Sequence, residues 1–110
     1  MSALALVAAA ALQLTVAQYS NDPGHDARDN GPDKIDVSAY PAEQKARYPL
    51  FVQKCSKCHA LARSVNSRFT AAEWKRYMKR MVRRPNAGTT DEQAEDIFEF
   101  LKYYSSKLGL

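Results

Sequence analysis

The sequence predicts an all-α fold, a small bundle of three to four helices in residues 41–110. Two observations support this. No stretch shows the sustained period-two alternation that is typical of strands, whereas apolar residues recur at helical spacing in three segments. Two of these segments also begin with the residues of a capping box. A chain of 110 residues has room for one domain.

The first expected helix begins at Pro41, because proline suits the first turn. Pro49 either kinks this helix or restarts it. After Pro49, helical spacing places four residues on one face: Phe51, Cys55, Cys58 and His59.

The second helix follows Thr70, which forms a capping box with Glu73. The turn at 83–90, RRPNAGTT, ends it. Thr90 and Gln93 cap the third helix in the same way. The predicted inner faces are Trp74, Tyr77, Met78 and Met81 in the second helix, and Ala94, Ile97, Phe98, Leu101 and Tyr104 in the third.

The N-terminal 40 residues differ in composition from the rest. Residues 1–17 are uncharged, consist mainly of Ala, Leu and Val, and end at Ala17, which predicts a signal peptide cleaved there. An uncleaved membrane anchor is the alternative, but 17 residues fall short of the roughly 20 that span a bilayer. Residues 18–40 are rich in Asp, Gly and Pro and predict a flexible tether that contains a solvated His25. We therefore expect an exported, for example periplasmic, protein with its folded domain at 41–110.

The two cysteines of the chain lie in the segment KCSKCHAL, residues 54–61. A disulfide between Cys55 and Cys58 would close a very short loop and constrain the unfolded chain little. A zinc site needs four ligands, and after His59 the remaining histidine is His25 in the predicted tether. Covalent attachment of haem uses both thiols and the adjacent imidazole. A haem would also help a domain of about seventy residues to fill its core.

The segment FVQKCSKCHAL, the Trp- and Met-bearing helix and the final helix DIFEFLKYYS together resemble a small single-haem cytochrome c of class I, over roughly residues 41–110. The resemblance implies one covalently attached haem c, held by Cys55 and Cys58, with His59 as the proximal iron ligand. It also implies that the first and last helices of the domain pack together around the haem. The sixth ligand in this family is usually a downstream methionine, for which Met81 at the helix end is favoured over Met78. An iron with an open or different sixth ligand is the third alternative.

Charge is distributed unevenly along a chain of net charge +4. Residues 54–84 contain a single acid, Glu73, and ten basic residues: Lys54, Lys57, Arg63, Arg68, Lys75, Arg76, Lys79, Arg80, Arg83 and Arg84. Arg63 and Arg68 are candidates for pairing with haem propionates. The others favour an acidic redox protein as partner. We expect no nucleic acid and no small-molecule substrate, and membrane contact only through the partner or an uncleaved N-terminus.

The function predicted from these features is electron transfer rather than enzymatic catalysis. His59 is the only histidine of residues 41–110, so no further imidazole is available there as a distal acid or base. Two other functions stay open. One is a gas-binding or sensing haem module with an open sixth site, and the other is a fixed electron-relay subunit of a larger oxidoreductase.

Overall fold

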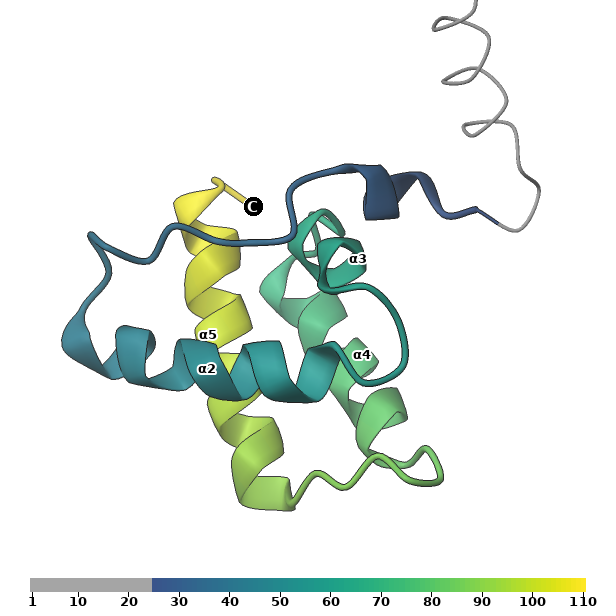
Figure 1. Cartoon of the computed structure of the whole chain (residues 1–110). Helices are drawn as coiled ribbons and strands as arrows, with labels where there is room; N and C mark the ends of the chain where they lie inside the picture. The colour runs from purple at the N-terminus through teal and green to yellow at the C-terminus, as the bar shows by residue number, and fades with distance from the viewer. Residues whose placement is uncertain (1–24) are drawn as a thin grey trace, which may run out of the picture.

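A computed structural model describes residues 25–110 and contains only helices in that range. Four α-helices follow a short 3-10 helix: η1 (Ala27–Asn30), α2 (Ala42–Cys55), α3 (Leu61–Val65), α4 (Ala71–Val82) and α5 (Asp91–Lys107) (Figure 1). The all-α prediction is confirmed. The predicted signal peptide at 1–17 lies outside the described residues.

Helices α4 and α5 begin where their capping boxes predict. The Thr70 hydroxyl accepts from the backbone N–H of Glu73 at 3.3 Å, and the Glu73 carboxylate accepts from the backbone N–H of Thr70 at 3.3 Å. Thr90 and Gln93 make the same reciprocal pair at 3.1 and 3.0 Å. These local bonds satisfy backbone donors that helix ends leave free, so both N-termini were predictable from the sequence.

Helix α2 continues through Pro49, which lies exposed on its surface, so the alternative that Pro49 restarts the helix is wrong. It also ends at Cys55, so Cys58 and His59 lie in the following turn and not on a helix face with Phe51. Cys58 and His59 therefore lie near Cys55 because of the turn after α2, and not because they share a helix face as predicted.

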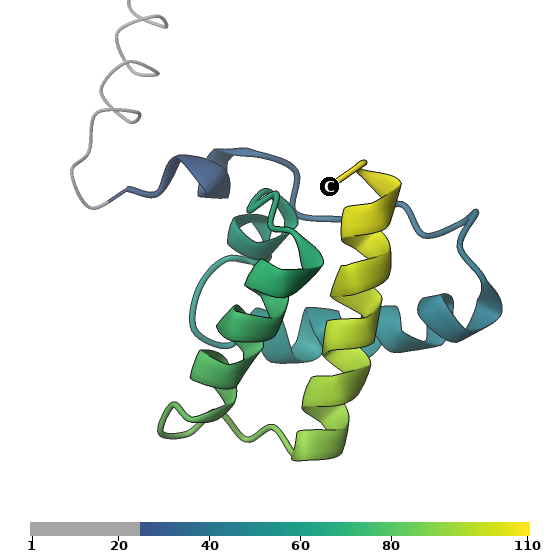
Figure 2. The same ribbon diagram turned by 180° about the vertical axis from the view of Figure 1, so that it is seen from behind.

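The core forms where α5 contacts both α2 and α4. Helix α2 crosses α5, and α4 runs alongside it, as the two opposite views show (Figures 1 and 2). The rings of Phe51 and Phe100 lie 5.2 Å apart, which joins α2 to α5. Phe100 is fully buried although the sequence analysis did not place it on the inner face, because α5 buries a stripe against two helices at once. The buried cluster consists of Ile35, Phe51, Val65, Trp74, Met78, Ile97, Phe100 and Leu101. Residues of α2, α3, α4 and α5, together with Ile35 before α2, thus share one apolar core.

Residues 25–40 lie against the helical domain, in contrast to the predicted flexible tether. The segment passes from η1 beside α3, past the C-terminal end of α5, to the start of α2 (Figures 1 and 2). Ile35 is only 9% exposed, and its backbone N–H donates to the Tyr48 hydroxyl at 3.1 Å. The Tyr40 ring lies 4.8 Å from the Tyr103 ring on α5. The acidic composition of this segment predicted solvent exposure, but Asp26 and Asp29 both pair with Arg63, more than thirty positions later in the chain.

Within residues 25–110, no helix is both long enough and apolar enough to cross a membrane.

Candidate functional site

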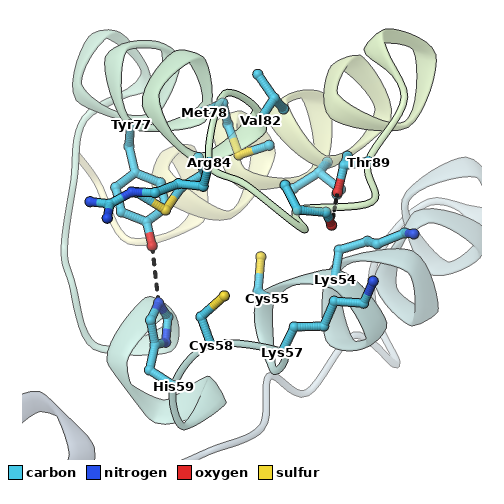
Figure 3. A pocket seen from close by; sticks show the side chains of 13 residues that line it. Lys54, Cys55, Lys57, Cys58, His59, Tyr77, Met78, Val82, Arg84 and Thr89 are labelled. Carbon is cyan, nitrogen blue, oxygen red and sulfur yellow. Dashed lines mark hydrogen bonds between the residues drawn. The ribbon is translucent and has the colours of Figure 1, made fainter.

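A largely apolar pocket lies between the α2–α3 turn, α4 and the loop 83–90 (Figure 3). The sulfur atoms of Cys55 and Cys58 point into it from one side, and Met78 faces them from α4. The lining residues are Lys54, Cys55, Lys57, Cys58, His59, Tyr77, Met78, Met81, Val82, Arg84, Ala87, Thr89 and Ile97. The candidate haem-attachment and iron-ligand residues Cys55, Cys58, His59, Met78 and Met81 therefore all border one pocket.

The two cysteines are free thiols with different environments. Cys55 is half-buried at the end of α2, whereas Cys58 is exposed in the turn. Burial raises the pKa of the Cys55 thiol to about 12, and the nearby Ser64 hydroxyl acts in the opposite direction. Cys55 is consequently a neutral thiol at physiological pH, not the low-pKa thiolate that is typical of a redox-active dithiol.

The orientation of the His59 imidazole is set by a bond at each nitrogen. Nδ1 lies 3.1 Å from the carbonyl oxygen of Ala60, and Nε2 lies 3.2 Å from the Tyr77 hydroxyl. A carbonyl can only accept, so Nδ1 carries the proton. In the neutral ring Nε2 then accepts from Tyr77. The lone pair of Nε2 thus points toward the Tyr77 hydroxyl on α4.

Tyr77 is the site residue that the sequence analysis missed. It was placed on the apolar face of its helix but not in contact with His59. Burial raises the pKa of its hydroxyl, which therefore stays protonated and able to donate. Its neighbours at i+1 and i+4, Met78 and Met81, also line the pocket. This spacing is a signal that could have identified Tyr77, since the three residues share one side of α4.

The two methionines differ in burial. Met78 is 7% exposed and belongs to the core cluster, whereas Met81, in the last turn of α4, is half-buried. Both thioethers are available to the pocket. Met78 has the larger role in packing.

His25 does not join the cysteines. Its Nε2 lies 2.8 Å from the side-chain oxygen of Asn30, beside η1. Across residues 25–110 no group of three or more His, Cys, Asp or Glu side chains is arranged to hold a metal ion. The four-ligand zinc site that was weighed from the sequence thus has no ligand set among these residues.

Three cations border the pocket: Lys54, Lys57 and Arg84. Lys54 also donates to the carbonyl of Gly88 at 2.7 Å, which ties the end of α2 to the loop 83–90. Arg63, predicted as a propionate partner, does not line the pocket and instead pairs with Asp29 at 2.7 Å. Arg68 is exposed in the turn before α4 and does not line it either.

No family model, curated protein or solved structure matches this chain. The possible chemistry of the site is therefore inferred from the side chains that line it. Two thiols, one imidazole and two thioethers border this apolar pocket, and sulfur together with imidazole nitrogen is a donor combination that iron, copper and zinc all accept. The two thiols lie at one side of the pocket, and Met78 faces them from α4.

Proposed function

We propose that the protein is a single-haem c-type cytochrome that transfers electrons between redox proteins outside the cytoplasm. The observation that carries the proposal is the convergence of Cys55, Cys58 and His59 on one apolar pocket, which Met78 borders on the opposite side and Met81 also lines. The haem iron would supply one-electron redox chemistry, and the protein would supply its attachment, its axial ligands and its surroundings. The packing of α2 against α5 also agrees with the class I resemblance.

The cysteines have the chemistry that this attachment needs. Each thiol would add across one vinyl group, forming a C–S bond while its hydrogen goes to the other vinyl carbon. No oxidant is required. The free state of both cysteines and the orientation of their sulfur atoms into the pocket support this role.

His59 is the proposed proximal ligand. Its Nδ1–H bond to the Ala60 carbonyl leaves Nε2 as the donor nitrogen. Tyr77 now donates to that nitrogen, so ligation would require His59 to give up this bond. We propose Met81 as the sixth ligand, because its thioether lines the pocket without belonging to the buried cluster, and keep Met78 as the alternative.

The proposed partner is an acidic redox protein that docks on α4. Four cations of this helix are exposed, and none of them has a carboxylate partner within residues 25–110: Lys75, Arg76, Lys79 and Arg80. Arg83 and Arg84 extend the same charge beyond the helix end. Unpaired surface charge of one sign accelerates the encounter with a partner of opposite sign.

The test is covalent haem in protein produced together with a cytochrome c maturation system. Wild-type protein should give a haem-stained band after denaturing electrophoresis, and the Cys55→Ala/Cys58→Ala double variant should lose it. His25→Ala, which removes the other histidine, is the matched control and should keep it. Wild-type protein that is folded and colourless would refute the proposal. Rapid binding of CO to reduced wild-type protein would instead favour the gas-binding alternative.

A further inference from the structure

Helix α3 follows directly after His59 and is too short to be stable by itself. It has five residues, and no side chain caps its N-terminus at Ala60. An isolated helix of this length is unstable in water, because the cost of nucleation exceeds the gain from so few bonds. Its position therefore depends on contacts with the rest of the protein.

A charged contact with η1 holds the outer side of α3. The Arg63 guanidinium donates to both carboxylate oxygens of Asp29, with Nη2 at 2.7 Å and Nε at 3.2 Å. Its Nε also lies 3.5 Å from a carboxylate oxygen of Asp26. Two-pronged bonds between arginine and a carboxylate are charge-assisted and fix the geometry of both groups.

An uncharged contact holds the other end of α3. The side-chain amide of Asn66, the C-cap of α3, donates to the carbonyls of Arg28 at 2.9 Å and Pro32 at 3.0 Å. Gly31 packs so closely on this amide that a Cβ atom there would collide with it. The fit between η1 and α3 is therefore specific in shape as well as in charge.

Arg63 connects this contact to the imidazole. Its backbone N–H donates to the Ala60 carbonyl at 3.1 Å, and the same oxygen accepts from Nδ1 of His59. We infer that η1 is a clasp that positions His59: Asp26 and Asp29 hold Arg63 and α3, which fixes the carbonyl that orients the imidazole. The inference rests on the proposed function and adds positioning residues about thirty positions before the haem motif.

Loosening the clasp should change the donor strength of His59. A bond from Nδ1–H to a fixed carbonyl makes the opposite nitrogen a stronger donor, which favours ferric iron. Without the clasp this bond weakens, and the reduction potential should rise.

The first test is Gly31→Ala in the full, haem-loaded chain. The variant changes no charge and leaves every residue of α3 intact, but its methyl group must displace Asn66. We expect amide exchange at 62–66 to become about fivefold faster or more, and the reduction potential to rise. Arg47→Gln is the control, since it removes the Arg47–Asp96 pair between α2 and α5 and should leave both readouts unchanged.

The second test separates positioning from simple charge effects. Arg63→Lys keeps the charge but not the two-pronged bond, and we expect about two- to fivefold faster exchange together with a higher potential. A charge effect alone predicts no change in this variant. Asp29→Asn should raise the potential in the same direction as Arg63→Lys, and Asp29→Glu should restore part of the wild-type behaviour.

Two results would overturn the inference. One is unchanged amide exchange in both Gly31→Ala and Arg63→Lys, and the other is faster exchange with an unchanged potential, which would mean a purely structural role. If the wild-type chain takes up no haem, the proposed function fails separately. The clasp is then tested by the imidazole ¹⁵N signals of neutral His59, in which the Nδ1–H form should decrease in Gly31→Ala. An unchanged signal would overturn the inference in that case too.

Discussion

At the scale of single residues, the two methionines of α4 differ in burial, and we propose that Met78 packs in the core whereas Met81 ligates the iron. Met81 lines the pocket but is half-buried and lies outside the buried cluster. If its sulfur is the sixth ligand, ferric wild-type protein should show a weak far-red absorption band. Met81→Ala should abolish this band, open the iron to CO and lower the reduction potential, because a thioether favours ferrous iron more than water does. Absorption spectra and CO titration measure these changes.

Met78→Ala is the matched variant, one turn earlier on the same helix. Because Met78 is 7% exposed within the core cluster, its truncation should lower the free energy of unfolding by about 2–5 kcal/mol. The far-red band should persist. Loss of the band in Met78→Ala and its retention in Met81→Ala would exchange the two assignments.

At the scale of elements, the N-cap of α4 stabilises the helix through contacts between residues that are close in sequence. The Thr70 hydroxyl accepts from the Glu73 backbone N–H at 3.3 Å and is exposed, so its removal leaves no cavity. Thr70→Ala should therefore lower the free energy of unfolding by about 0.5–2 kcal/mol in urea titrations. Thr70→Ser keeps the hydroxyl and should recover most of this loss. Equal destabilisation by Ser and Ala would show that the cap does not stabilise the helix.

The η1–α3 contact should respond to acid. Arg63 lowers the pKa of the Asp29 carboxyl, and Arg28 lowers that of Asp26. A carboxyl with a lowered folded-state pKa stabilises the fold above its unfolded-state pKa of about 4, and this stabilisation is lost as pH falls through the folded-state value. The contact should thus be intact at neutral pH and weaken only below about pH 4.

The side-chain amide signals of Asn66 measure this release, since they report the bonds to Arg28 and Pro32. We expect them to shift toward free-amide positions in acid while the signals of the α5 core stay in place. In Asp29→Asn part of this transition should be missing. An identical acid transition in wild type and Asp29→Asn would assign it to other groups.

Sequence patterns predicted the elements that are stabilised locally and missed those that depend on distant partners. The ends of α4 and α5 were predictable, because the residues that cap each helix are neighbours in sequence. Helix α3 and η1 were not predicted, since neither has a strong pattern of its own. Asp29 resembled a solvated tether residue until its partner Arg63, 34 positions later, was visible.

The same distinction applies to the site. The cysteines and His59 belong to one short motif, so their common position at the pocket was predictable. Tyr77 shares one side of α4 with Met78 and Met81, but its contact with His59 joins residues 18 positions apart, which the sequence analysis did not connect. The fully buried Phe100 was likewise missed, because only the assembled fold shows that α5 contacts two helices.

At the scale of the whole molecule, α4 and α5 carry opposite charge side by side. The exposed face of α4 is basic, whereas the first half of α5 carries five acids: Asp91, Glu92, Glu95, Asp96 and Glu99. Lys75 and Lys79 line a groove together with Asp91 and Glu95, so their charge also acts within the molecule. Arg76 and Arg83 are exposed and do not line that groove, which makes them better probes of a docking surface.

Arg76→Glu/Arg83→Glu should therefore slow electron transfer to an acidic redox protein. The decrease should be largest at about 0.01 M ionic strength, where charges act over roughly 30 Å, and small at about 0.1 M, where screening shortens this to roughly 10 Å. Lys34→Glu/Lys45→Glu makes the same change in net charge at exposed positions away from α4 and is the control. Stopped-flow rates over a salt series separate the two cases. If both double variants slow the reaction equally, net charge rather than a surface on α4 guides the encounter. If only the α4 variant does, the cations of this helix form the docking surface.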